Sequence, residues 1–189
     1  MNCERQMKER WDKKRVLLHI CCAPCSIYVF RRLREEGAEV SGYFYNPNIH
    51  PYTEFMKRIA TLTNYAEISS FPLAVDTEYD LESFLKGALA RGKDRCIFCY
   101  RMRLEKAFVK AAETGADALT TTLLYSKYQR HEDIKMIALE LSEKYGIPFL
   151  YEDFRTGWKE GIERSKALNM YRQPYCGCIF SEKERYGEK

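Results

Sequence analysis

Short apolar segments alternate with longer amphipathic segments along this chain, and this alternation restricts its fold more than any other feature. Strands are expected at residues 16–20, 39–45, 71–75, 118–124 and 148–154. Helices are expected at residues 26–36, 52–66, 81–90, 99–114, 131–145 and 158–169. Strands that alternate with helices require crossover connections, which give a mostly parallel sheet covered on both faces. The sequence therefore predicts a single Rossmann-like α/β domain.

The length of 189 residues suits one hydrophobic core, and a hydrophobic content of 46% is typical of an ordered protein. We expect a charged N-terminal extension at residues 1–14, the α/β domain at residues 15–180, and a loose charged tail at residues 181–189. The net charge of +4 is compatible with a phosphate-bearing partner but is also common in proteins that bind no nucleic acid.

The eight cysteines indicate metal binding or redox chemistry. No apolar run approaches the roughly 20 residues of a membrane span, and the charged N-terminus lacks the apolar segment of a secretory signal. These features favour a cytoplasmic protein without a membrane partner. Structural disulfides are rare in the reducing cytosol, where clustered cysteines more often bind metals or react.

Three cysteines follow the first expected strand, in the loop that usually forms one wall of the binding site in an α/β sheet. They are Cys21, Cys22 and Cys25, and no glycine-rich phosphate-binding motif occurs in the chain. The N-terminus of the following helix should favour their thiolate forms. Alternatively, Cys22 and Cys25 form a bare redox pair, or some of these thiols are ordinary buried side chains.

A second pair, Cys96 and Cys99, lies at the entrance to the helix expected at residues 99–114, where both sulfurs would lie on one face. Two cysteines from each segment could hold tetrahedral zinc or a four-iron four-sulfur cluster, and spacing does not separate these metals. Nor does it decide which of the first three cysteines are ligands. An additional iron, completed by Asp94 or water, is a further hypothesis.

A third pair, Cys176 and Cys178, is separated by one glycine. A disulfide between them would close a small strained ring, and strained disulfides are easily reduced. We therefore interpret this pair as a two-electron dithiol, with two further metal ligands or two idle thiols as the alternatives. Cys3 has no predicted role, and His19, within a strand, is interpreted as a buried core histidine.

Four motifs in this order resemble those of the QueH family of epoxyqueuosine reductases. They are Cys21-Cys22-Ala-Pro-Cys25, Cys96-x-x-Cys99-Tyr100-x-x-Arg103, Thr120-Thr-Thr-Leu-Leu-Tyr125-Ser-x-Tyr128-Gln129, and Cys176-Gly-Cys178. The resemblance covers residues 15 to about 180. It implies a fold similar to the adenine-nucleotide hydrolases of the ATP pyrophosphatase type, with cysteines in place of their glycine-rich loop.

The resemblance also implies an activity: reduction of the epoxide of epoxyqueuosine at the anticodon wobble position of tRNA, the last step of queuosine biosynthesis. It implies a 4Fe-4S cluster held by Cys21, Cys22, Cys96 and Cys99, and a redox-active disulfide between Cys176 and Cys178. Iron could polarise the epoxide C–O bond as a Lewis acid. The physiological electron donor is not specified by any motif.

Further candidates were selected by their place at expected strand ends or loops. Candidate proton donors or diol ligands are Tyr125, Asp94, Tyr128 and Asp153. Candidates for contacts to RNA phosphates or bases are Arg155, Trp158, Lys159 and Arg172. Each could equally be structural. Three other functions stay open from the residues alone: a cluster-dependent tRNA sulfur-transfer enzyme, a zinc-stapled RNA-binding domain, and a thioredoxin-like oxidoreductase.

Overall fold

A four-stranded parallel sheet forms the centre of the computed structural model, which describes residues 11–187. Its strands are β1 (Arg15–His19), β2 (Glu39–Phe44), β3 (Leu73–Val75) and β4 (Ala118–Thr121). Their order is β3-β2-β1-β4, with β1 paired to both β2 and β4. The chain therefore winds outward from β1 in both directions, and the strand order reverses between β1 and β4.

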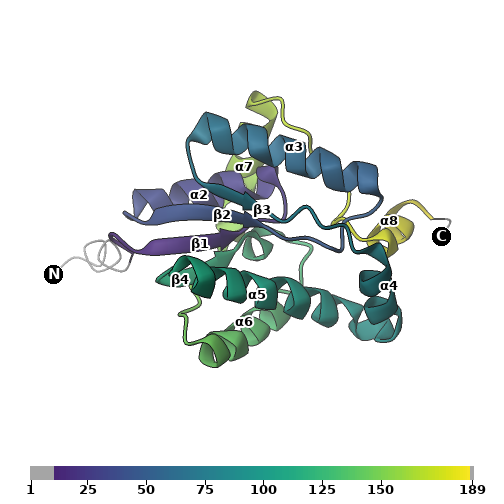
Figure 1. Ribbon diagram of the computed structural model, residues 1–189. Coiled ribbons are helices and arrows are strands. Elements are labelled where there is room, and N and C mark those ends of the chain that lie inside the picture. The colour runs from purple at the N-terminus through teal and green to yellow at the C-terminus, as the bar shows by residue number, and fades with distance from the viewer. Residues whose placement is uncertain (1–10, 188–189) are drawn as a thin grey trace.

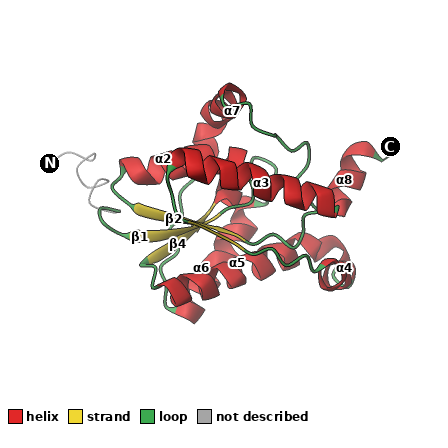
Figure 2. Cartoon of the chain, turned by 45° about the horizontal axis from the view of Figure 1, so that its top comes forward, coloured by secondary structure: helices red, strands yellow, loops and turns green. Residues whose placement is uncertain are grey.

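Helices cover both faces of this sheet (Figure 1). Helices α2, α3 and α7 lie on one face, α5 and α6 lie on the other, and α4 and α8 lie at one end, an arrangement that Figure 2 shows from a second direction. Their bounds are α2 (Ala23–Glu35), α3 (Tyr52–Ser69), α4 (Leu81–Leu89), α5 (Arg95–Thr114), α6 (His131–Tyr145), α7 (Trp158–Ala167) and α8 (Ile179–Tyr186). Within residues 11–187, the short 3-10 helices are η1 (Gly92–Asp94), η2 (Thr122–Tyr125) and η3 (Phe154–Gly157).

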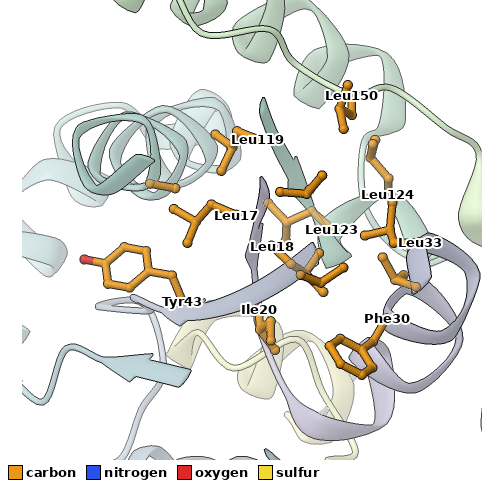
Figure 3. Packing of buried hydrophobic residues seen from close by; sticks show 14 of the residues in the cluster. Leu17, Leu18, Ile20, Phe30, Leu33, Tyr43, Leu119, Leu123, Leu124 and Leu150 are labelled. Atoms are coloured by element: carbon orange, nitrogen blue, oxygen red, sulfur yellow. The ribbon is translucent and has the colours of Figure 1, made fainter. Parts of the chain in front are cut away.

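The core lies on both sides of β1, whose last four residues are all buried. Successive side chains of a strand point to opposite faces, so Leu17 and Leu18 enter different halves of the core. Figure 3 shows Leu17 on the same side as Tyr43, and Leu18 on the side of Phe30 and Leu33 from α2. Pairing with β2 on one side and β4 on the other holds β1 in register and hence positions the cysteines that follow it.

The expected single α/β domain with a parallel sheet is confirmed. Two helices begin earlier than predicted. Helix α2 begins at Ala23, so Cys25 lies in its first turn instead of in a loop, and α5 begins at Arg95. The strand expected at residues 118–124 ends at Thr121, whose side chain accepts a hydrogen bond from the Leu123 amide and starts η2.

The strand predicted at residues 148–154 is wrong. Only one isolated bridge forms there, between Leu119 and Phe149, among the residues described. Asp153 ends the extended segment because its carboxylate accepts a hydrogen bond from the Arg155 amide and caps η3. This Asx-type turn competes with the sheet ladder for the backbone.

Helix α8 occupies most of the tail expected at residues 181–189 and ends at Tyr186. Within the extension expected at residues 1–14, Trp11 is buried in the core at 2% exposure. Residues 1–10, which include Cys3, lie outside the described part of the chain. Among the described residues, no helix is both long and apolar enough for a membrane span.

Candidate active site

The first cysteine segment lies where the strand order reverses, at the carboxyl ends of β1 and β4. Cys21 comes two residues after β1, and Thr122 comes directly after β4. The Cys21 amide donates a hydrogen bond of 2.9 Å to the Thr122 hydroxyl, whose oxygen lies 3.2 Å from the Cys21 sulfur. The topology of the sheet thus fixes the cysteine segment at the usual ligand site of such folds.

Three sulfur atoms gather at this point. The Sγ atoms of Cys21 and Cys22 lie 3.8 Å apart, and those of Cys22 and Cys25 lie 2.8 Å apart. All three lie within 4.8 Å of one another, close enough to share one metal centre. Cys22 is the N-cap residue of α2, and Pro24 in the first turn favours helix initiation at that point.

The three thiols differ in acidity. Hydrogen bonds from Cys22 and Cys25 hold the pKa of Cys21 well below its usual value. Burial raises the pKa of Cys22, and the hydrogen bond to Cys21 raises the pKa of Cys25. The thiolate form that the helix N-terminus was expected to favour is therefore concentrated on Cys21.

The second cysteine pair comes from the first turns of α5. Burial raises the pKa of Cys96 and raises that of Cys99 to about 11. Arg103, one turn further along, places its Nη1 atom 4.0 Å from the Cys99 sulfur, and its Nη2 atom donates to Asn46 Oδ1 at 2.5 Å. Arg103 is 3% exposed, so its guanidinium is a buried cation close to the sulfurs.

The third pair lies on the loop that leads into α8. Cys178 is the N-cap residue of α8, and its sulfur accepts a hydrogen bond of 3.4 Å from the Ser181 amide. The Cys178 thiol donates to Cys176 and thereby lowers the pKa of Cys176 to about 5, while the pKa of Cys178 is raised by the same contact. The negative charge of Cys176 in turn raises the pKa of both Cys96 and Cys99, so the second and third pairs are close in space.

A buried arginine holds the third pair in place. Arg58 of α3 is 2% exposed, and it donates hydrogen bonds to the carbonyl oxygens of Cys176 at 3.0 Å and Tyr175 at 3.2 Å. Its Nε atom donates to Glu54 Oε1 at 2.7 Å, and Glu54 Oε2 accepts from Tyr171 at 2.5 Å. We call this group, formed by Glu54, Arg58 and Tyr171, the arginine clamp.

The loop is attached at a second side as well. The His50 amide donates to the Gly177 carbonyl at 2.8 Å, and the Tyr175 hydroxyl donates to the His50 carbonyl. Gly177 has a φ of +123°, and an added Cβ would lie 2.9 Å from Ile49 Cγ1 and 3.0 Å from Arg58 Nη1. Only glycine fits both the backbone conformation and the space.

One cavity of about 450 Å³ connects the three cysteine segments. Its wall includes Cys21, Cys25, Cys96, Cys176 and Cys178. Cys22 contacts the same wall through Gln173, whose Nε2 atom donates to the Cys22 sulfur at 2.7 Å. Residues more than 150 positions apart in the sequence therefore place their thiols around one space.

The proposed proton donors lie in different places. Tyr128 lines the cavity, but Tyr125 and Asp94 are not among its lining residues within the described chain. Tyr125 is 2% exposed, and its hydroxyl donates to the Trp158 carbonyl at 3.1 Å. Asp94 is exposed at the start of α5. Asp153 pairs with Arg155 at 2.6 Å.

The proposed RNA contacts are also divided. Trp158 lines the thiol cavity, whereas Lys159 faces a separate surface hollow that it shares with Tyr28.

The interpretation of His19 as a core residue is confirmed. Its Nδ1 atom lies 2.8 Å from Thr121 Oγ1, its Nε2 atom lies 3.2 Å from the Tyr45 carbonyl, and burial lowers its pKa to about 3.

Sequence reasoning missed Arg58 and Gln173, which contact the thiol segments directly. The spacing of Glu54 and Arg58 is that of a helical ion pair, but it does not reveal burial. Gln173 offered no signal, because its role depends on how the C-terminal loop returns to the start of α2. Arg103 and Thr122 belong to the motifs quoted above, where nothing in the sequence alone indicated contact with sulfur.

Comparison with known proteins gives a consistent result. The family model described as "Epoxyqueuosine reductase QueH" matches residues 16–184. A protein of that name from Dehalococcoides mccartyi is 36% identical over 92% of this chain and 96% of its own length. Another from Thermotoga maritima is 37% identical over 90% of this chain and 91% of its own length.

A solved structure gives the same fold. It is described as a predicted subunit of tRNA methyltransferase from Methanocaldococcus jannaschii, and it superposes with a TM-score of 0.55 over 81% of this chain and 74% of its own. At 15% sequence identity, this likeness concerns the fold alone.

Proposed function

We propose that this chain, which belongs to the QueH family of epoxyqueuosine reductases, is an oxidoreductase that converts epoxyqueuosine in tRNA to queuosine. The observation that carries the proposal is the cavity that gathers thiols from three distant segments. An epoxide reductase needs a source of two electrons beside the bound substrate, and a thiol pair at the cavity wall provides one.

The residues of this site fit a 4Fe-4S cluster. Cluster iron prefers thiolate ligands, and the sulfurs of the first two segments supply four, from Cys21, Cys22, Cys96 and Cys99. Bound there, the cluster would supply electron transfer and an iron Lewis acid that polarises the epoxide C–O bond. Cys25 lines the same cavity as Cys21 and Cys96 and is available to an additional iron.

Protein groups around these sulfurs would stabilise their negative charge. Thr122, Gln173 and Arg103 each place a donor near the sulfur of one proposed ligand, at 3.2, 2.7 and 4.0 Å. Hydrogen bonds to ligand sulfurs tune the reduction potential of a cluster and orient its ligands. Buried Arg58 and Arg103 add two positive charges close to the site.

Oxidation of the Cys176–Cys178 dithiol would supply the electrons and protons that reduction of the epoxide consumes. Reduction of the epoxide to an alkene consumes two electrons and two protons and releases the oxygen as water. Oxidation of Cys176 and Cys178 to a disulfide releases two electrons and two protons, and an external reductant would then restore the thiols. The exposed Cys176 is the side of the pair that such a reductant can reach. As proton donors, Tyr125 and Asp94 stay predictions.

The test is a single turnover under anaerobic conditions. Reduced protein, mixed with epoxyqueuosine tRNA and no external reductant, is expected to form about one queuosine per chain and lose two free thiols. Cys176→Ser should abolish this turnover and retain iron and sulfide, whereas Cys21→Ser should lose both. Turnover with an unchanged thiol count would refute the dithiol role, and zinc without sulfide in active protein would refute the cluster.

A further inference from the structure

Aromatic side chains lie at the mouth of the thiol cavity. Tyr128, in the loop between η2 and α6, lines the cavity and yet is 78% exposed. Its ring meets Trp158 edge to face, with centroids 5.9 Å apart and an interplanar angle of 76°. A large aromatic ring that is left open to solvent beside a reactive cavity has a free face with which to bind a ligand.

The Trp158 ring is held rigidly from behind. It stacks on Tyr125 with centroids 5.3 Å apart, and the Tyr125 hydroxyl donates to the Trp158 carbonyl. Helix α7 can approach Tyr125 closely because position 161 is glycine: an added Cβ there would lie 2.2 Å from the Tyr125 hydroxyl oxygen. Buried Tyr125 therefore acts as a support that fixes the indole before any ligand arrives.

The surroundings of these rings are positively charged. The Lys127 Nζ atom lies 5.7 Å from the Trp158 ring centroid. Among the described residues, the cavity wall carries one carboxylate, that of Glu184, and five guanidinium groups, those of Arg58, Arg95, Arg103, Arg130 and Arg185. Arg58 pairs with Glu54, Arg95 with Glu184 and Arg130 with Asp133, which leaves an excess of positive charge on the wall itself. Aromatic faces surrounded by cations are the chemistry with which proteins bind bases on an anionic single strand.

We propose that Tyr128 and Trp158 form a clamp that stacks a base lifted out of a single-stranded RNA loop, with Lys127, Arg130 and Arg185 contacting the phosphates beside it. The proposal rests on the proposed function, and it names the surface that directs the wobble nucleotide into the thiol cavity. An opening lined by stacking rings admits a planar heterocycle and requires the nucleotide to leave its own stack.

The test measures binding of an anticodon stem-loop RNA with guanosine at the wobble position, so that no chemistry takes place. Trp158 is one of two tryptophans, and the other, Trp11, is buried at 2% exposure. Titration of the anaerobically purified protein with RNA should therefore quench the fluorescence of Trp158. Tyr128→Ala should weaken RNA binding about tenfold, the effect of losing one base–aromatic stack, and Tyr128→Phe should bind as the wild type does.

Tyr52→Ala is a matched control. Tyr52 is 53% exposed and also meets its aromatic neighbour, Tyr79, edge to face, with centroids 5.2 Å apart, but it does not line the cavity among the described residues. This variant should bind RNA normally. If Tyr128→Ala also binds as the wild type does, or if RNA leaves the fluorescence unchanged, the proposed stacking by Tyr128 and Trp158 is wrong.

Reductase assays separate the clamp from the proposed function. In the clamp proposal, Tyr128→Ala raises the KM for epoxyqueuosine tRNA, whereas Tyr128→Phe, which keeps the ring and removes only the hydroxyl, retains the wild-type KM. A wild-type protein that reduces the epoxide while Tyr128→Ala retains normal affinity and KM would overturn the clamp alone. A wild-type protein that binds RNA through Tyr128 but reduces nothing would overturn the proposed reduction and leave the RNA surface intact.

Discussion

At the scale of single residues, the dithiol shows how one hydrogen bond separates the acidities of two neighbouring thiols. The Cys178 thiol stabilises the Cys176 thiolate and, in doing so, holds its own proton more tightly. Since thiolates are the nucleophiles of disulfide exchange, the exposed Cys176 should be the first of the two thiols to attack an external disulfide.

The acidity of Cys176 can be measured by alkylation. The rate of its reaction with iodoacetamide, followed by mass spectrometry of the peptide, should reach half its maximum near pH 5. In Cys178→Ala the donor is lost, and the midpoint should rise toward the ordinary value of a cysteine, about 8.5. A midpoint near 8.5 in both proteins would contradict the assigned hydrogen bond.

Arg58 is a positioning residue for the dithiol. Arg58→Lys keeps the positive charge opposite Glu54 but loses the planar guanidinium fork that donates to Glu54 and to both loop carbonyls at once. We expect iron content to stay unchanged and single-turnover reduction to slow at least about tenfold, because a displaced reactive group costs rate steeply. Arg91→Lys, at an exposed arginine that also donates to a carbonyl, is the control and should react normally. Equal rates in the wild type, Arg58→Lys and Arg91→Lys would show that the arginine clamp does not position the dithiol.

At the scale of elements, Gly177 determines the path of the loop before α8. Gly177→Ala should destabilise the protein by about 1–3 kcal/mol, from positive φ and from contact with Ile49 and Arg58, and should slow reduction. Gly146→Ala shares the positive φ, at +66°, but meets nothing within 4 Å. Chemical denaturation should therefore show a smaller loss of about 1 kcal/mol and normal activity for the control. Equal losses would mean that crowding at Gly177 is unimportant.

Elements with a clear hydrophobic periodicity were predictable, whereas a turn that depends on side-chain capping was not. The helix expected at residues 131–145 has those bounds, since its apolar side chains recur at helical spacing and Gly146 ends it. The expected strand at residues 148–154 failed because Asp153 starts a 3-10 turn. Helix α8 was missed because half of its eight residues are charged and none is buried.

The candidate site was predictable in its cysteines and in two aromatic residues of the cavity wall, Tyr128 and Trp158. The grouping of the cysteines into three segments was evident from spacing, and the structure brings all three segments to one cavity. The neighbours that position them were not evident, because contacts such as that between Gln173 and Cys22 join residues 151 positions apart. No local pattern encodes a contact of that kind.

At the scale of the whole molecule, buried His19 links stability to pH. Its pKa of about 3 lies below the value of about 6.5 in an unfolded chain, so the unfolded state takes up a proton first as the pH falls. This group therefore lowers the free energy of unfolding by about 1.4 kcal/mol per pH unit below pH 6.5, until the pH approaches 3. Its contribution is constant above pH 7.

Denaturant unfolding at several values between pH 7.5 and pH 5 checks this dependence. His50, whose pKa burial lowers to about 4, adds an effect of the same sign. In His19→Asn the unfolding free energy should be lower at pH 7.5 and should then fall less steeply as the pH drops. An identical slope in variant and wild type would show that another group controls the acid response.

The late position of the Cys176 loop in the chain has a consequence for the order in which the parts of the site are synthesised. Ribosomes synthesise the strands, α2 and α5 before the loop that carries Cys176, so the nascent chain has its first two cysteine segments while one wall of the cavity is still missing. In the proposed function, a cluster inserted at this stage would enter through that open side, before the last residues of the described chain complete the cavity wall. The order of synthesis therefore places the proposed cluster ligands before the proposed reductant, so that a cluster could be built before the thiols that would reduce the substrate arrive.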